Sequence, residues 1–396
     1  MRLLLHEWNS FTGFDIKQAF REEGIDFDTT WLNARTRSQE ETIEFMEKFD
    51  KLLKNKEYDA VFSINFQPPM AEVCHNNKVM YIAWTYDSPA LCGFEHQHYF
   101  DTNRVFLFDS AELALHKKMN KPHLYHLNLA TNVKRMNSIK MTPMQQLRFQ
   151  SEISFVGQMY TTELHDMMQS MSPYAVGFLQ ALVDMQMKDY DSNLIRNLIT
   201  DEVIDTISNP ELIEKMEKYN EFFSAVAEGQ LRLAGFRSFL QRAVTNRERL
   251  MILSLLSKHY SVRLFSRDRH EVLENVTYAG AVDYRKEMPL IFKNSKINLN
   301  ITAKNIENGI PQRCIDVLGC HGFLLTNYQE DLFTEFEEEK DVVTYKSMEE
   351  AVDKAGFYLK HDQLRNEIAH NGYKKVRDLF NYHTQLAKIW KITGLK

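Results

Sequence analysis

The sequence predicts a soluble α/β protein with two domains, each built on a parallel sheet. With 396 residues and 44% apolar content, the chain can form two domains of ordinary size, each with its own core. Short runs rich in Val, Ile and Phe alternate with helical patterns, which is typical of parallel βαβ units. This alternation stops near residue 131 and resumes at residue 152.

The first domain is predicted over residues 1–135, and its elements follow one another in strand and helix order. We expect strands at residues 2–8, 59–66, 79–87, 104–110 and 123–130, and helices at residues 15–23, 40–58, 68–78 and 111–120.

The second domain is predicted over residues 136–378. Its boundary with the first domain falls within a polar linker at residues 131–150 that follows neither a helical nor a strand period. The segment between its first two strands is long for one crossover and helical throughout, so we expect a helical insert at residues 161–256. A terminal helix is predicted at residues 379–396. Strands are expected at residues 152–160, 260–266, 276–282, 296–302, 322–327 and 341–345.

Charge and cysteine content restrict the cellular setting. The net charge of -6 provides no global attraction to nucleic acid or to an anionic membrane. The four cysteines form no CxxC pair and read as reduced, cytosolic thiols. The apolar start ends at Leu5, which is too short for an export signal, and no run reaches the length of a membrane span. We therefore expect a cytoplasmic protein.

Residues 295–327 carry the strongest functional signal. The strand expected at residues 296–302 is followed by Gly309, Pro311, Arg313 and Asp316, and the residues after such a strand lie at the carboxyl edge of the sheet. A helix is expected from Ile310 to Leu318. A helix start and an arginine in its first turn suit a diphosphate, and a carboxylate one turn deeper suits a ribose. The alternative is that these residues are helix punctuation and a solvated ion pair.

Several segments together resemble one enzyme family. Residues 155–160, 262–266, 276–302, 308–327, 331–336 and 366–376 resemble the C-terminal half of glycosyltransferases of the spore-maturation-protein (CgeB-like) type. Residues 84–89 and 102–110 resemble the N-terminal domain found with it. The resemblance implies a GT-B fold, in which two Rossmann-like domains face each other across a cleft. It also implies that the terminal helix packs back on the first domain.

The resemblance further implies a donor site in the second domain. Gly157 and the amides after Gly309 would approach the phosphates, Arg313 would bind the diphosphate, and Asp316 would bind the ribose. The loop at residues 281–284, after Gly280, would lie against the nucleotide base through its backbone. Asn308 stands where many relatives have a glutamate, so the resemblance does not decide between retention and inversion. The implied donor residues are Gly157, Tyr160, Gly280, Val282, Tyr284, Asn300, Asn308, Gly309, Ile310, Arg313 and Asp316.

A general base is expected from the first domain. Asp87 follows a strand and is placed to accept a proton from an acceptor hydroxyl, whereas the alternative is that it caps the turn at Ser88 and Pro89. His6 and Glu7 are weaker candidates for the base. The loop after the first strand is expected to approach the transferred sugar. The residues expected on the acceptor side are Asn9, Ser10, Thr12, Gly13 and Ser88.

Two patterns that imitate metal sites are judged to be ordinary structure. His96 and His98 have alternate spacing but no third ligand nearby in the sequence. The Asp-x-Asp patterns at residues 26–28 and 189–191 are expected in solvated turns. We therefore predict no metal and no cofactor other than the nucleotide-sugar co-substrate.

The function predicted is transfer of a sugar from a nucleotide-diphosphate donor, of UDP type, to a hydroxyl of a carbohydrate or protein acceptor. Arg313 would also act catalytically by neutralising the departing diphosphate. The alternatives are a sugar-nucleotide epimerase or hydrolase, and a sugar-nucleotide or glycan-binding protein without turnover. The insert is a candidate surface for self-association. No nucleic-acid partner is expected.

Overall fold

The computed structural model describes residues 1–34, 38–90, 96–162, 164, 168–169, 171–207 and 228–395. The chain divides into two compact units. Among described residues, unit 1 contains 1–130, 228–235 and 382–395, and unit 2 contains 131–207 and 236–381. Each unit has a six-stranded sheet whose neighbouring strands are all parallel. The two predicted parallel sheets are therefore present.

The sheet of unit 1 has the strand order β2-β1-β3-β4-β5-β6. One strand, β2, was not predicted, because its sequence DFDTT is polar and it lies at the edge of the sheet. The Asp-x-Asp pattern of residues 26–28 therefore lies in a strand and not in the expected turn. The bounds are β1 Arg2–His6, α1 Gly13–Glu22, β2 Asp26–Thr30, α2 Gln39–Asn55, β3 Ala60–Ile64, α3 Pro68–Asn76, β4 Met80–Trp84, η1 His96–Tyr99, β5 Asn103–Leu107, α4 Ser110–Lys118 and β6 Leu124–His126.

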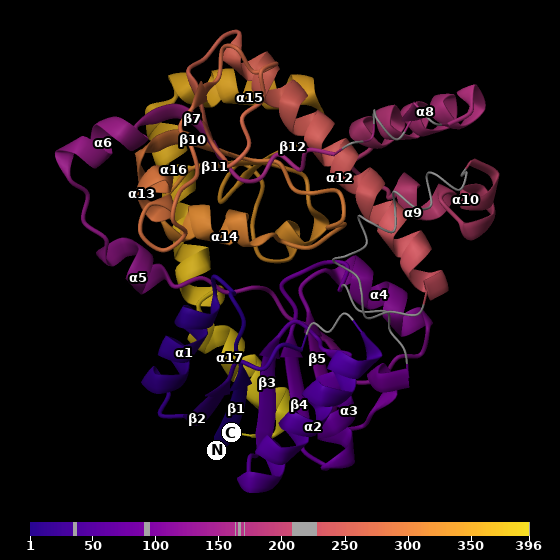
Figure 1. Cartoon of the computed structure of the whole chain (residues 1–396). Coiled ribbons are helices and arrows are strands. Elements are labelled where there is room, and N and C mark those ends of the chain that lie inside the picture. The colour runs from indigo at the N-terminus through magenta and orange to yellow at the C-terminus, as the bar shows by residue number, and fades with distance from the viewer. Residues whose placement is uncertain are drawn as a thin grey trace. The chain divides into compact units, whose positions relative to one another are not determined.

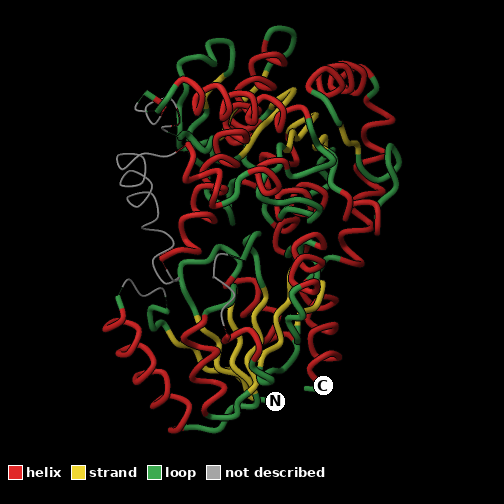
Figure 2. The backbone as a smooth tube through the Cα atoms, turned by 90° about the vertical axis from the view of Figure 1, so that its right-hand side faces the viewer, coloured by secondary structure: helices red, strands yellow, loops and turns green. Residues whose placement is uncertain are grey.

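Helices cover both faces of this sheet (Figures 1 and 2). Strand residues alternate between two apolar clusters, because successive side chains point to opposite faces. Leu3 and Leu5 pack with α1, whereas Leu4 packs with α2 and α3. A sheet that is buried on both faces explains why its inner strands read as continuous apolar runs.

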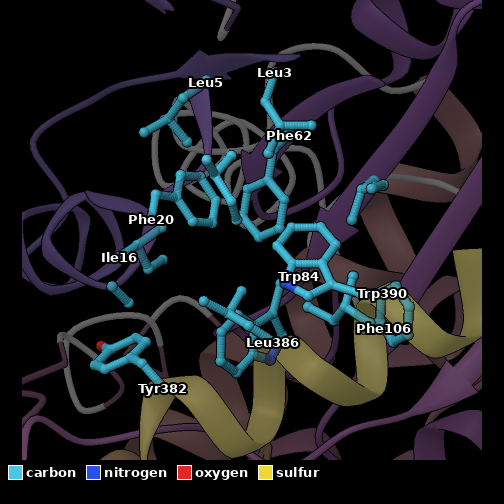
Figure 3. Packing of buried hydrophobic residues seen from close by; sticks show 14 of the residues in the cluster. Leu3, Leu5, Ile16, Phe20, Phe62, Trp84, Phe106, Tyr382, Leu386 and Trp390 are labelled. Atoms are coloured by element: carbon cyan, nitrogen blue, oxygen red, sulfur yellow. The ribbon is translucent and has the colours of Figure 1, made fainter. Parts of the chain in front are cut away.

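The terminal helix α17, Tyr382–Thr393, completes the first of these clusters. Figure 3 shows Leu386 and Trp390 among the side chains that project from the sheet and from α1. The ring centroid of Trp390 lies 6.0 Å from that of Phe20, and its Nε1 donates a 3.0 Å hydrogen bond to Glu23. The last helix of the chain is thus part of the core of unit 1.

The sheet of unit 2 has the order β12-β11-β10-β7-β8-β9, so β7 and β10 are neighbours at the centre although about 140 residues separate them. The strands are β7 Ser151–Val156, β8 Val262–Phe265, β9 Thr277–Tyr278, β10 Ser295–Asn300, β11 Leu324–Asn327 and β12 Val343–Tyr345. Its helices are α13 Met288–Asn294, α14 Gln312–Gly319, η3 Glu330–Thr334, α15 Met348–Lys360 and α16 Asp362–Leu379.

The predicted linker contains two helices, α5 Val133–Ser138 and α6 Pro143–Phe149. The expectation of an irregular linker is therefore wrong. Each helix is too short to show a period, but Met136 and Phe149 are fully buried, and Thr142 and Gln145 form a capping box at the start of α6.

In the described residues between β7 and β8, all regular secondary structure is helical. Its elements are α8 Pro173–Lys188, α9 Leu194–Leu198, α10 Asp201–Ile207 and α12 Glu228–Ser257. The last of these ends shortly before β8 and supplies buried polar residues close to the carboxyl edge of the sheet.

Candidate functional site

The candidate donor site lies in unit 2, where β10 ends and α14 begins. The helix starts at Gln312, two residues later than predicted, because Pro311 has extended backbone angles and occupies the N-cap position. No side chain caps this end of the helix. The partial positive charge of the helix start is therefore not offset by a capping oxygen.

Arg313 lies in the first turn of α14, as predicted, and its guanidinium is short of partners. Its Nε and Nη1 atoms are buried and have no hydrogen-bond partner among the residues that the structure describes. Its Cζ lies 5.7 Å from the ring centroid of Phe292. Burial lowers the pKa of Arg313, with a partly opposing effect of Asp316. Because buried donors without acceptors are costly, the arrangement is suited to a bound anion.

A second arginine, Arg249 from α12, reaches the same edge of the sheet. Its side chain is 7% exposed. Its Nε donates a 3.2 Å hydrogen bond to the carbonyl oxygen of Ile301, and Nη1 donates to the carbonyl of Gln158. These carbonyls follow β10 and β7, so the guanidinium bridges the ends of the two central strands. Burial lowers the pKa of Arg249, and the charge of Arg313 acts in the same direction.

Two predicted donor residues, Gly157 and Tyr160, lie next to Arg249. A Cβ on Gly157 would lie 3.3 Å from the Phe155 ring, which is a tight contact, and 3.9 Å from Arg249 Nη1, which is an ordinary one, so the glycine leaves room for the Phe155 ring and lies next to the guanidinium. Tyr160 has a positive φ of 54°, and its ring centroid lies 4.8 Å from Arg249 Cζ. Gly157, Tyr160 and Arg249 therefore form one group.

Neither guanidinium has an ion-pair partner within 4.0 Å in the described part of the chain. Sequence reasoning missed Arg249, because it lies in a helical pattern about 90 residues after Gly157 with no motif around it. Only the packing of α12 against the sheet brings it to Arg313. Two cations held together without a carboxylate at ion-pair distance form a site that favours a polyvalent anion such as a diphosphate.

Asp316, the predicted ribose ligand, lies in the interior of unit 2. The side chain is 0% exposed, and its Oδ1 accepts hydrogen bonds from Thr131 at 2.7 Å, Gln312 at 2.8 Å and Tyr284 at 3.4 Å. Its Oδ2 is buried and has no hydrogen-bond partner in the described part of the chain. Burial raises the pKa of Asp316 to about 6. In this structure the carboxylate is an interior group.

Asn300, another predicted donor residue, is also an interior residue. Its Nδ2 donates to Thr326 Oγ1 at 2.9 Å and to Thr302 Oγ1 at 3.0 Å, inside the sheet. The side chain of Ile310 is buried as well, so only its backbone is available to a ligand. Gly309 lies directly before it and is buried, whereas Asn308 is half-buried and donates to Glu330 at 2.9 Å.

The loop after β9 was predicted to lie against the nucleotide base. Gly280 has a positive φ of 79°, which turns the chain there, and Val282 is half-buried. Tyr284 donates to Asp316, and Arg135 Cζ lies 5.8 Å from its ring centroid. This loop therefore contacts α14 through the phenol of Tyr284.

In unit 1, Asp87 follows β4 and is held by a neighbouring loop. Asn65 Nδ2 donates a 2.7 Å hydrogen bond to Asp87 Oδ2, and Asn65 Oδ1 accepts from the N–H groups of Tyr86 and Asp87. Asn65 adopts a positive φ of 65°. Asp87 is half-buried, so its carboxylate is oriented and partly accessible, as a general base requires.

Two predicted acceptor residues are interior. Ser88 is buried, and its hydroxyl donates to Glu112 at 2.9 Å and to Asp109 at 3.2 Å. Thr12 is buried at the N-cap of α1, 2.9 Å from the Ser10 hydroxyl. These side chains stabilise their loops and do not present themselves to an acceptor. Asn9 is exposed, Ser10 is half-buried, and Gly13 starts α1.

The two weaker base candidates, His6 and Glu7, are buried and have close polar neighbours. The His6 imidazole lies 2.8 Å from the carbonyl of Leu32, and Glu7 forms a 2.5 Å ion pair with Lys17.

The two histidines that imitate a metal site have different neighbours. The ring centroid of the buried His98 lies 3.9 Å from that of Phe66, and His96 lies 3.5 Å from Glu72. In the parts of the chain that the structure describes, no group of three or more His, Cys, Asp or Glu side chains is arranged to hold a metal ion.

Comparison with known proteins identifies the fold and the class of the C-terminal part. Residues 237–391 match the family model described as "Glycosyl transferase-like". No curated protein has a sequence that matches this chain. The match covers α14 and both arginines, so the predicted glycosyltransferase class is confirmed by it.

Solved structures share the fold at low identity. HepE of Anabaena, in a complex with UDP-glucose, is 10% identical over all of both chains with a TM-score of 0.54. Sucrose-phosphate synthase from Thermosynechococcus elongatus is 10% identical over 100% of this chain and 98% of its own, also with a TM-score of 0.54. WaaG, a glycosyltransferase of lipopolysaccharide biosynthesis, is 11% identical over 99% of each chain with a TM-score of 0.52. The chain thus has the predicted GT-B fold.

One further finding concerns membranes. None of the helices in the described ranges combines the length and the apolar character that crossing a bilayer requires.

Proposed function

We propose that this protein transfers a sugar from a UDP-type nucleotide-sugar to a hydroxyl group of a carbohydrate or protein acceptor. The observation that carries the donor assignment is the pair Arg249 and Arg313 beside an uncapped helix start. Both guanidinium groups are largely buried, and neither has an ion-pair partner in the described ranges of the chain. A diphosphate offers the negative charge that neither guanidinium has as an ion-pair partner, and the acceptor oxygens that Nε and Nη1 of Arg313 lack. The solved complexes of HepE with UDP and UDP-glucose, on the same fold, support this assignment.

The arginines would assist the chemical step by stabilising the leaving group. As the bond from the anomeric carbon to the diphosphate oxygen breaks, the electron pair stays on that oxygen, and the guanidinium groups offset the new charge. The acceptor oxygen bonds to the anomeric carbon and gives its proton to a base. Asp87 is our candidate for that base, since Asn65 fixes its carboxylate while leaving it partly accessible.

We propose that these two cations supply the charge stabilisation that a divalent metal supplies in other transferases. Transfer is then expected to continue in excess EDTA and not to increase with added magnesium or manganese. Loss of transfer in EDTA, with recovery on adding either metal, would contradict this part of the proposal.

Exposed aromatic residues in unit 1 support a carbohydrate acceptor. Phe11 and Phe14 follow β1, and Trp31 follows β2, so all three lie at the carboxyl edge of the sheet. They are 50%, 43% and 62% exposed. Aromatic faces pack on the apolar faces of sugar rings, and Lys17, 6.0 Å from the Trp31 ring centroid, adds a hydrogen-bond donor.

The finer classification is also an inference. In the second half of the chain, the segments that resemble the CgeB-like type follow one another in the same order as in that type, which supports membership of it. The sparse cysteines without a CxxC pair support a cytoplasmic location. Of the cysteines that the structure describes, Cys74, Cys314 and Cys320 are free and buried, which agrees with reduced thiols.

The decisive experiment separates donor binding from transfer. The protein would be titrated by calorimetry with UDP, ADP and GDP, and then incubated with the matching nucleotide-sugars and a panel of oligosaccharides and peptides. We expect UDP to bind and a glycosylated product to form. Donor consumption without any such product would indicate a hydrolase or epimerase, and binding without consumption would indicate a binding protein.

A further inference from the structure

A small polar cavity lies beside the candidate diphosphate site in unit 2. It has a volume of about 60 Å³ and is formed by three segments, residues 186–193 of the insert, residues 302–308 after β10, and residues 327–329 at the end of β11. Asn308, one of the predicted donor residues, lines it together with Thr302, Asn327 and Gln329. Two of the three segments therefore contribute amide or hydroxyl groups through these residues.

The position of the cavity follows the order of the strands. The predicted base loop follows β9, the two arginines lie at the ends of β7 and β10, and the cavity lies at the ends of β10 and β11. Neighbouring strands are about 4.8 Å apart. A nucleotide-sugar laid along this edge, with its diphosphate on the arginines and its base towards β9, would bring its sugar to the cavity.

The insert holds the loop that forms this cavity. Asn193 Nδ2 donates a 3.0 Å hydrogen bond to Glu307, and Arg196 forms an ion pair with the same carboxylate at 2.5 Å. From α12, Thr245 Oγ1 accepts a 2.9 Å hydrogen bond from the N–H of Lys304. The loop that leads to Gly309 is thus fastened by two helices of the segment between β7 and β8.

Charges around the cavity are already matched. Lys304 Nζ lies 3.4 Å from the buried carboxylate of Glu248 and 3.8 Å from the ring centroid of Tyr190. At the rim, Lys346 pairs with Asp191 at 3.0 Å. With Arg196 on Glu307, each of these three cations has a carboxylate partner. Asp189 adds a further carboxylate, which accepts from the N–H groups of Asp191 and Ser192.

We propose that this cavity receives hydroxyl groups of an uncharged donor sugar and that the insert thereby selects against donors with a carboxylate, such as uronic acids. This inference rests on the proposed donor function. Hydroxyl groups can exchange hydrogen bonds with the amides and with Thr302, whereas a ligand carboxylate would meet Asp189, Asp191 and Glu307 and find each nearby cation already paired.

The test uses matched donors that differ at one carbon. UDP, UDP-glucose, UDP-glucuronate, UDP-galactose and UDP-galacturonate are titrated into the full-length protein by calorimetry. We expect each uronate to bind at least tenfold more weakly than its neutral counterpart. Equal or tighter binding of the uronates in both pairs would overturn the proposal. Failure of UDP itself to bind would instead overturn the proposed donor function.

Two variants locate the selection. Glu248→Gln removes the charge that matches Lys304 but retains a hydrogen-bond acceptor for Tyr190, and Asp191→Asn frees Lys346 at the exposed rim. In each variant, the ratio of the affinity for the neutral donor to the affinity for the uronate should fall at least threefold. Asp191→Asn keeps the test valid if Glu248→Gln fails to fold. If both variants fold and neither lowers this affinity ratio, the selection lies elsewhere and the assignment of the cavity is refuted.

Discussion

The hydroxyl of Thr131 donates a 2.7 Å hydrogen bond to the buried carboxylate of Asp316. Thr131 is the first residue of unit 2, and its N–H donates to the carbonyl of Phe380 at the end of α16. Its methyl group would lie 3.0 Å from a side chain placed on Gly319 of α14. The contact therefore fastens the start of the unit to the helix that carries Arg313.

Asp316 should make the stability of the protein depend on pH. Burial raises its pKa from the ordinary 3.8 to about 6, so the folded state holds this proton more strongly than the unfolded chain. Stability should then fall as the pH rises from about 4 to about 6, and stay constant above, with a total cost of roughly 3 kcal/mol. Asp316→Asn should flatten this dependence in urea unfolding measured at several pH values.

Two variants around this contact separate structure from ribose binding. Thr131→Val removes one hydrogen bond to Asp316 and should leave UDP affinity within about threefold, since Thr131 contacts the carboxylate and not the arginines. If the carboxylate is purely interior, Asp316→Asn should behave in the same way. Much weaker UDP binding in Asp316→Asn alone would restore the predicted ribose contact, through a rearrangement of α14.

Arg313→Gln should weaken UDP binding by about ten- to a hundredfold, because charge-assisted hydrogen bonds contribute about 1.5–3 kcal/mol. The same change should leave the melting temperature of the nucleotide-free protein equal or higher, since it removes a buried cation with unpartnered donors. Arg377→Gln, at an exposed arginine of α16, is the matched control. Unchanged affinity for UDP in folded Arg313→Gln would remove this residue from the donor site.

Asp87→Asn should lower the turnover number by about a hundredfold or more while leaving UDP affinity unchanged, because a general base contributes to the chemical step and not to donor binding. The amide keeps the size of the side chain and can still accept from Asn65. Steady-state kinetics with saturating donor and acceptor would measure the effect. A variant that turns over at the normal rate would show that Asp87 only orients its loop.

Trp390→Ala should destabilise unit 1 strongly, by about 3–5 kcal/mol, because the indole fills the space beside Phe20 and Phe62 and its Nε1 pairs with Glu23. Trp390→Phe should cost less, since it keeps most of the apolar contact. Trp31→Ala is the control at an exposed indole. Thermal unfolding followed by circular dichroism would rank the three, and equal losses for Trp390→Ala and Trp31→Ala would contradict the packing in Figure 3.

Strand-forming runs, the parallel arrangement and the place of Arg313 could be read from the sequence, because each depends on the pattern of nearby residues. Val61 and Phe62 point to opposite faces of a sheet wherever that sheet lies. Arg313 follows Pro311 and a strand, so its place in the first turn of a helix is a local property. Local patterns failed where they were short or polar, as in β2 and in α5 and α6.

Only the tertiary structure decided which polar side chains face a ligand. Asp316, Asn300, Ser88 and Thr12 carry suitable groups at suitable places in the chain, but packing buries them among internal donors and acceptors. Arg249 carries no local signal and becomes a partner of Arg313 only because α12 folds over the ends of β7 and β10. Burial and pairing depend on contacts between distant segments, which the order of the residues along the chain does not reveal.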